Sequence, residues 1–322
     1  MSLLRIDVPW NASLTTGEHQ VVFYFLIVAT LAFFAGFART WLTRNEVGPR
    51  YRSAVSARLG MLGVATLVYV LLAVTFQTSY DAGPEGWTPN SSTIDLFSAR
   101  YMGWTVTVPL LTIELLAVCA VSGVLARRSR VIALAASIAM IFCGFLGGIV
   151  IDDGTNPVPF VFWAVISAVF WVITNVVLIR AVRMSRTQLT GEAHALLNRA
   201  TIVLLAGWVV YPVVYFLPLF GAGGAMTTAI MVALTSADVT IKLLFSTRIH
   251  RVAKLRTAED VRAGVDVHPE SIWISSVKLS DAGLPREVYL ADGAAIHERR
   301  RRPPTGSATA SVDPGHFDEN PL

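Results

Sequence analysis

The stretch AMTTAIMVALTSADVTIKLLFSTR, residues Ala225–Arg248, is long and apolar enough to cross a bilayer as a helix, for which roughly 20 residues are needed. An aspartate, Asp238, and a lysine, Lys242, nevertheless lie within it. They are four residues apart, so their side chains face the same side of the helix. Charged groups at this depth are costly and mark functional positions. The stretch therefore predicts a membrane helix with a buried charged pair.

Further stretches of similar length and hydropathy precede this one. The chain has 322 residues and is 54% hydrophobic and 15% charged, whereas a soluble domain has about 25% charged residues. The predicted spans are His19–Thr43, Ser53–Gln77, Ile94–Leu125, Val131–Ile151, Val158–Val182, Leu197–Phe220 and Ala225–Arg248. The expected fold class is an all-α membrane protein, a seven-transmembrane helix bundle.

The ends of these spans alternate in charge. The basic set holds Arg39, Arg44, Arg50, Arg52, Arg127, Arg128, Arg130, Arg180, Arg183, Arg186, Arg248, Arg251, Lys254 and Arg256. The other set holds Asp81, Glu85, Asp152, Asp153 and the uncharged Gly221–Gly224. The positive-inside rule places the basic set in the cytoplasm. We therefore expect the N-terminus outside and the C-terminus in the cytoplasm, which requires an odd number of spans.

Composition divides the chain into four parts. Residues 1–18 are expected to be an extracellular segment without a removable signal peptide, and 19–251 the helix bundle. Residues 252–297 would form a cytoplasmic extension, in which Ile272–Leu279 and Val288–Leu290 predict two strands of a hairpin around Asp281–Gly283. Arginines, prolines and small polar residues in 298–322 predict a disordered tail.

Two interpretations of the charged pair are open at this point. Asp238 and Lys242 could form a purely structural ion pair. Alternatively, burial disfavours the ammonium form of a lysine and leaves a nucleophilic amine that can form a Schiff base. The carboxylate one turn away would then balance the charge of the protonated imine.

The third predicted span decides between them. Residues 100–114 read RYMGWTVTVPLLTIE, which resembles the third-helix signature of microbial (type 1) rhodopsins: Arg-Tyr, an acidic residue, Trp, then Thr, Pro and Leu-Leu. The last span resembles their seventh helix, with an aspartate four residues before the retinal lysine. Two more spans are similar to that family. The sixth contains Trp208, Tyr211, Pro212 and Tyr215, and the fifth contains FVFWA at Phe160–Ala164. The resemblance covers about Val21 to Arg251.

The resemblance implies a covalently bound retinal and a role for each matching residue. Lys242 would form the imine, Asp238 would be its counterion, hydrogen-bonded by Tyr69 and Tyr211, and Arg100 would lie on the extracellular side. The retinal pocket would be lined by Trp104, Trp208, Tyr211, Trp163, Leu111, Met140, Gly144 and Tyr215. Rigid aromatic walls suit a long apolar polyene.

Position 103 departs from the family pattern. Outward proton pumps carry their main counterion and proton acceptor there, but this chain has Gly103, so the three-position motif reads Gly103, Thr107 and Glu114. A missing negative charge disfavours the protonated imine and removes the usual first proton acceptor. We therefore expect no efficient outward pump. A bound anion, a water molecule or an engineered substitution at this position are open alternatives.

Glu114 occupies the family's cytoplasmic proton-donor position. Arg58 lies about three turns from Tyr69 toward the cytoplasm, level with Glu114. A buried pair would keep Glu114 ionised and delay reprotonation of the imine, which predicts a slow photocycle with a long-lived deprotonated, blue- or UV-absorbing intermediate. Two alternatives are that Arg58 extends to the lipid headgroups and that Glu114 is a protonated buried acid.

These features favour a photosensor. An arginine at position 58 and an extension after the last helix resemble the cryorhodopsins, a sensor-like subgroup from cold-living actinobacteria. The expected function is a slow retinal photoreceptor of the cell membrane that signals to a soluble cytoplasmic partner. A light-driven ion transporter, of protons weakly or inward or of anions, is the alternative, and a retinal-free seven-helix protein is a third.

The remaining expectations concern partners and other chemistry. The resemblance implies a homo-oligomer, either a trimer or a pentamer, in the lipid bilayer. The two cysteines, Cys119 and Cys143, lie in apolar runs without zinc-site spacing and are expected to be buried hydrophobic residues. The arginines flank the apolar runs, as membrane topology requires, so nucleic-acid binding is not expected, and neither is enzymatic activity or a metal site.

Overall fold

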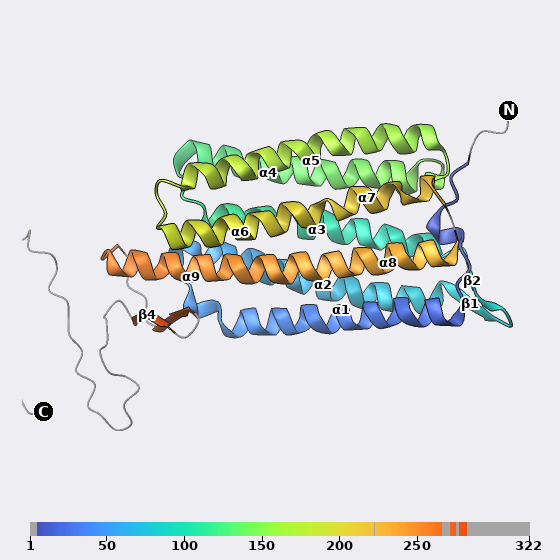
Figure 1. Ribbon diagram of the computed structural model, residues 1–322, viewed down its shortest axis with the longest axis horizontal. Helices are drawn as coiled ribbons and strands as arrows, with labels where there is room; N and C mark the ends of the chain where they lie inside the picture. The colour runs from blue at the N-terminus through green and yellow to red at the C-terminus, as the bar shows by residue number, and fades with distance from the viewer. Residues whose placement is uncertain (1–4, 222, 266–270, 275–276, 282–322) are drawn as a thin grey trace, which may run out of the picture. The chain divides into compact units, whose positions relative to one another are not determined.

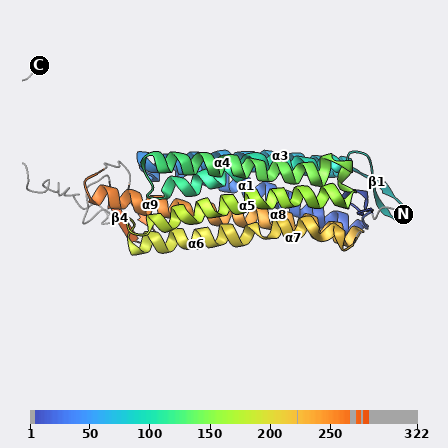
Figure 2. The same cartoon turned by 90° about the horizontal axis from the view of Figure 1, so that it is seen from above.

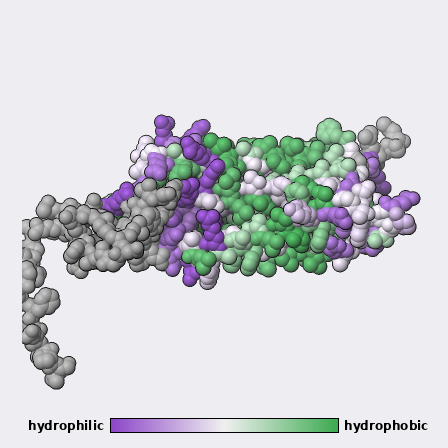
Figure 3. Space-filling model, turned by 60° about the horizontal axis from the view of Figure 1, so that its bottom comes forward, coloured by the Kyte–Doolittle hydropathy of each residue, from purple (hydrophilic) through white to green (hydrophobic). Residues whose placement is uncertain are grey.

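A computed structural model describes residues 5–221, 223–265, 271–274 and 277–281 of the chain (Figure 1). Seven helical stretches in this part are long and apolar enough to cross a membrane. Hydrophobic side chains dominate the middle of the bundle surface, and hydrophilic ones gather toward its two ends (Figure 3). The predicted seven-helix membrane fold is confirmed.

The helices follow one another with short connections. Their bounds are α1 (Thr16–Leu42), α2 (Arg52–Thr78), α3 (Thr93–Val118), α4 (Gly123–Phe145), α5 (Pro157–Ser185), α6 (Gly191–Trp208), α7 (Val210–Phe216), α8 (Gly224–Val239) and α9 (Ser246–Arg262). A π-helix, η4 (Leu146–Val150), extends α4, and another, η7 (Thr240–Phe245), joins α8 to α9. The sixth span therefore comprises α6, α7 and a short 3-10 turn, and the seventh comprises α8, η7 and α9.

Neighbouring helices pack in chain order from α1 to α5, and α8 packs against α1, which closes the bundle (Figures 1 and 2). Local signals start the helices. Thr15 and Glu18 form a capping box at α1, in which each side chain accepts a hydrogen bond from the other's backbone N–H. Asn156 caps α5 in a similar way through the backbone N–H of Val158.

The third and fourth spans differ from the prediction. Helix α3 ends at Val118 rather than Leu125, and α4 begins at Gly123 rather than Val131. Hydropathy could not show this break, because the apolar run continues across it. The chain turns where Cys119 is extended and Gly123 has a φ of +65°, a conformation that glycine adopts without steric cost. The arginines Arg127, Arg128 and Arg130 therefore lie on α4.

The seventh span is longer than predicted. It continues from Arg248 to Arg262, so the basic residues expected in the following loop lie on α9. Hydropathy ended the predicted span at the first charged residues. Ile249, Val252 and Ala253 are nevertheless fully buried in the bundle, and this apolar face keeps the chain helical beyond Arg248.

Two short antiparallel hairpins complete the described structure. Strands β1 (Tyr80–Gly83) and β2 (Gly86–Pro89) form one of them, which was not expected. Strands β3 (Ser271–Ile274) and β4 (Val277–Asp281) form the other. Both β3 and β4 fall largely within the stretch expected to be a single strand, and the expected second strand at 288–290 lies outside the described residues. The bundle up to Thr257 and the segment from Ala258 onward are two compact units.

Candidate functional site

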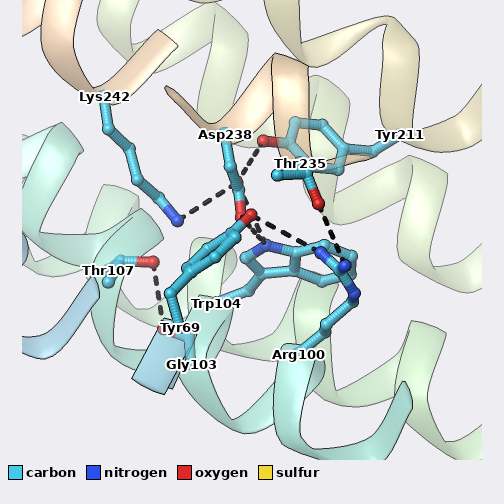
Figure 4. A network of polar contacts seen from close by, with 9 residues as sticks. All are labelled: Tyr69, Arg100, Gly103, Trp104, Thr107, Tyr211, Thr235, Asp238 and Lys242. Carbon is cyan, nitrogen blue, oxygen red and sulfur yellow. Dashed lines mark hydrogen bonds and ion pairs between the residues drawn. The ribbon is translucent and has the colours of Figure 1, made fainter. Parts of the chain in front are cut away.

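A buried ion pair lies in the seventh span. Nζ of Lys242 is 3.1 Å from Oδ1 of Asp238, and the two side chains are 4% and 2% exposed (Figure 4). Asp238 belongs to α8, whereas Lys242 belongs to the π-helix η7. π-helical turns are rare and are frequent at functional sites. The pair predicted from the four-residue spacing is therefore present and inaccessible to bulk water.

Three other helices donate hydrogen bonds to Asp238 (Figure 4). The hydroxyl of Tyr69 on α2 donates to Oδ2 at 2.9 Å, and that of Tyr211 on α7 donates to Oδ1 at 2.6 Å. Nε1 of Trp104 on α3 lies 3.2 Å from Oδ1 and 3.1 Å from Oδ2. The two tyrosine bonds are the ones expected from the sequence. Charge-assisted bonds of this kind are strong and fix the position of the carboxylate.

Arg100 extends this network by about one turn of α8, from Asp238 to Thr235. Its guanidinium donates to Oγ1 of Thr235 at 3.1 Å and approaches the hydroxyl oxygen of Tyr69 at 3.5 Å. The residue is 2% exposed, and its Nε has no hydrogen-bond partner in the described part of the chain. A small cavity at the ion pair is lined by Arg100, Lys242 and Asp238 among others. Its described lining thus holds two basic side chains and one carboxylate.

Gly103 lies beside the ion pair without contributing charge. A Cβ at this position would lie 2.8 Å from Cγ1 of Val68, so the valine fills the space where a side chain would begin. Thr107 donates to the backbone oxygen of Gly103 at 2.9 Å and is thereby occupied within its own helix. The small cavity measures about 10 Å³, which is at the lower limit for one water molecule.

A second, much larger cavity of about 330 Å³ lies next to the network. Its size is within the range of small-molecule sites. Six of the expected pocket residues line it: Trp104, Trp208, Tyr211, Tyr215, Met140 and Gly144. Phe97, Tyr101, Phe160 and Trp171 also line it and were not expected. The lining is therefore mostly aromatic and apolar.

Two of the expected pocket residues are not in this lining. Leu111 is buried at 1% exposure but does not border the cavity. Trp163 instead packs close to the π-helix η4, where a Cβ on Gly147 would come within 2.6 Å of the Cβ of Trp163. Sequence similarity located both residues along their helices but could not show which neighbour each side chain meets.

Lys242 lines the small cavity and not the large one. Arg100 and Trp104 line both and therefore lie between them. The amine thus lies beside the space in which a long apolar ligand would fit.

The N-terminal segment contributes to the lining of the large cavity, which was not expected from the sequence. Val8, Pro9 and Trp10 are among the lining residues. The backbone N–H of Ile6 donates to the Thr155 oxygen at 2.8 Å, and Thr227 donates to the Pro9 oxygen at 3.1 Å. These bonds tie the segment to the helix ends.

Glu114 and Arg58 lie on the other side of the ion pair, toward α9. Ser246 donates to Oε2 of Glu114 at 2.7 Å, and Arg58 is 3.4 Å from Oγ1 of Thr247. Glu114 is 1% exposed and Arg58 4%. The two are near enough for their charges to interact, but no direct ion pair joins them among the described residues. In place of the expected direct pair, Glu114 contacts Ser246 and Arg58 contacts Thr247, the next residue of α9.

Comparison with known proteins agrees with this geometry. Residues 20–255 match the family model described as bacteriorhodopsin-like protein. The Bacteriorhodopsin-II-like protein of Haloquadratum walsbyi (strain DSM 16790 / HBSQ001) is 30% identical over 178 residues, which are 55% of this chain and 67% of that protein. Archaerhodopsin-2 of Halobacterium sp. (strain aus-2) is 26% identical over 163 residues, or 48% of this chain and 57% of that protein.

Solved structures give the same result for the fold. The crystal structure of a thermophilic rhodopsin superposes with a TM-score of 0.70 and 24% identity, covering 77% of this chain and 98% of that one. At this level of identity, the likeness shows a shared helix arrangement.

Proposed function

Because the chain belongs to the bacteriorhodopsin-like family, the microbial rhodopsins that bind retinal and act as light-driven pumps or sensors, we propose that it is a slow-cycling retinal photoreceptor. Retinal would be held as an imine on Lys242, with Asp238 as the counterion. The bound chromophore supplies light absorption and an isomerisation that displaces the charge at the lysine nitrogen. Side chains of this protein would hold the chromophore, balance its charge and exchange its proton.

The residues present fit such a group. The cavity of about 330 Å³ has the aromatic and apolar walls that a polyene requires. The only described basic side chain beside it with a carboxylate at contact distance is Lys242, 3.1 Å from Asp238. Burial of both side chains excludes water from the linkage.

One observation carries the choice of a sensor over an outward pump. Asp238 is the one carboxylate lining the cavity at Lys242 among the described residues, and it accepts hydrogen bonds from Tyr69, Tyr211 and Trp104. A proton placed on Asp238 would weaken these three bonds, because each is strongest to the ionised carboxylate. Gly103 offers no alternative acceptor. Rapid outward proton transfer therefore lacks a suitable first proton acceptor.

The cytoplasmic half supports a slow cycle. Burial of Glu114 disfavours its charge, while the nearby guanidinium of Arg58 opposes that effect. Whether Glu114 holds a proton therefore depends on the position of Arg58. Arg58 is itself anchored to Thr247, close to Lys242 along the seventh span. Movement at Lys242 would thus change the positions of both Arg58 and Glu114.

The remaining parts of the proposal follow from the charge distribution and the resemblance. The arginine-rich ends are assigned to the cytoplasm and the N-terminus to the outside. We assign the chain to the cryorhodopsin-like sensors, acting as a trimer or pentamer, with a soluble partner that binds the cytoplasmic extension.

A light-driven ion transporter is the second candidate. It is favoured by the buried polar groups Glu114, Ser246 and Arg58, which could carry protons inward from Lys242. Illumination of a cell suspension separates the two functions. A photoreceptor leaves the external pH unchanged with or without a protonophore, whereas a proton transporter changes it, and the protonophore alters that change.

A further inference from the structure

A polar residue recurs every fourth position along the seventh span. The series is Asp238, Lys242, Ser246, His250 and Lys254. Residues four apart are neighbours on a helix. The sixteen residue steps from Asp238 to Lys254 extend over roughly 24 Å at 1.5 Å per residue. A row of polar side chains therefore leads from the buried ion pair to Lys254 in the middle of α9.

The members of this series beyond Lys242 have acidic partners. Ser246 donates to Glu114 at 2.7 Å. Nε2 of His250 is 3.5 Å from Oε2 of Glu46, and Nζ of Lys254 is 2.7 Å from the same oxygen. Glu46 belongs to the short 3-10 helix η2 (Arg44–Glu46) between α1 and α2 and is 30% exposed. The path thus connects a fully buried acid with one that reaches solvent.

His250 is the unusual member. Its side chain is 11% exposed, its Nδ1 has no hydrogen-bond partner in the described part of the chain, and its Nε2 meets Glu46 only at 3.5 Å. Oε1 of Glu114, at the inner end of the path, is also unpartnered there. Buried polar groups without partners call for a functional explanation or a bridging water. Imidazole is the side chain that most readily exchanges a proton near neutral pH.

We propose that His250 is a proton-relay residue that connects Glu114 with the cytoplasm at Glu46. The inference rests on the proposed function, because only a light-driven cycle would call for a proton at Glu114. The imidazolium of His250 gives a proton to the Glu114 carboxylate through water next to the Ser246 hydroxyl. The neutral imidazole then regains one proton from solvent at Glu46. The net result is the transfer of one proton from the cytoplasm to Glu114, in which one N–H bond of His250 breaks and is formed again.

The charges that face His250 suit this role. They are Glu46 from η2, Arg58 from α2 and Lys254 from its own helix. The neighbouring His250 and Lys254 lower the pKa of Glu46 to about 2, so this carboxylate is ionised at cytoplasmic pH. An anion at 3.5 Å attracts the imidazolium, while Arg58 repels it toward Glu46. Movement of Arg58 toward His250 would therefore promote release of the His250 proton, whereas movement away would favour its retention.

Flash photolysis of the retinal-loaded full chain tests the relay. In His250→Gln, the slow recovery of the dark absorption should be delayed by on the order of a hundredfold, the usual contribution of a proton-transfer group. The recovery should also lose its dependence on pH. Azide, a small weak acid that carries protons, should restore the rate. His194→Gln, on α6, is the matched control and should recover normally.

A measurement in the dark provides a readout independent of the cycle. The ring nitrogens of His250 should show a titration in ¹⁵N NMR spectra recorded over a range of pH. The midpoint should change in Glu46→Gln, whereas the signals of His194 should not. Glu46→Gln also replaces His250→Gln as the kinetic variant if the latter does not fold.

Each result decides one of the two proposals. Unchanged recovery in His250→Gln with a normal dark spectrum, or a His250 ring that does not titrate, overturns the relay. A coloured parent protein whose recovery shows no pH dependence also overturns it and leaves retinal binding intact. A protein that stays colourless with retinal overturns the proposed function instead.

Discussion

Val68 occupies the space into which a side chain at Gly103 would project, with Cγ1 only 2.8 Å from the position of a Cβ. Valine is β-branched and has few accessible rotamers, so it cannot easily move aside. Helices α2 and α3 are thus packed around a glycine at position 103. A larger side chain at this position would disturb the contact between the two helices.

The first prediction concerns this position. Gly103→Asp alone should destabilise the protein by about 1–3 kcal/mol through overpacking, measured as a lower midpoint of thermal unfolding. Gly103→Asp combined with Val68→Ala should relieve that strain. It should also extend to higher pH the range in which the retinal-loaded protein keeps its visible colour, because a second carboxylate favours the protonated imine. Equal stability of the single and double variants would contradict the packing argument.

The second prediction concerns the counterion. Asp238→Asn removes the negative charge that Lys242 contacts at 3.1 Å. Loss of visible absorption should begin at lower pH, by one unit or more, since one pKa unit corresponds to about 1.4 kcal/mol. A pH titration of the absorption spectrum measures this. Asp95→Asn, at an exposed position in the first turn of α3, is the control. An unchanged titration in Asp238→Asn would assign the counterion to another group.

The third prediction concerns the groups between Lys242 and the cytoplasm. Arg58→Ala and Glu114→Gln should each change the recovery time after a flash by about tenfold or more, because both side chains are buried and anchored to α9. Arg127→Ala, exposed on α4, should leave it unchanged. Identical traces for all three variants and the parent would remove Arg58 and Glu114 from the cycle.

The fourth prediction concerns acid stability. The pKa of Glu46 is lowered from 4.5 to about 2, mainly by His250 and then by Lys254. A lowered pKa means that the ionised form is favoured in the folded state, so its stabilisation is present above pH 4.5 and is lost as the pH falls toward 2. The difference in thermal midpoint between the parent and Glu46→Gln should therefore shrink over this range. A difference independent of pH would mean that Glu46 acts through packing.

Hydropathy predicted the seven spans because lipid requires long apolar helices whatever their partners. It did not predict where α3 and α9 end. The first depends on the backbone at Gly123, and the second on burial of Ile249 and Val252 by neighbouring helices. Both are tertiary effects that no local window of sequence contains.

The site was predictable where it depends on spacing within one helix. Asp238 and Lys242, four residues apart, form the predicted contact, and Tyr69 and Tyr211 bond Asp238 as the resemblance implied. Contacts between distant elements were not predictable. Residues near Trp10 line the large cavity, and His250 approaches Glu46, only because of how distant elements are placed.

The most direct test is borohydride reduction of the retinal-loaded protein, followed by peptide mapping. We expect a visible absorption band and a retinyl group fixed to Lys242. Lys242→Ala should remain colourless, whereas Lys254→Ala, which keeps the pocket intact, should be coloured. A coloured Lys242→Ala variant, or a retinyl group on any other residue, would show that Lys242 does not hold retinal.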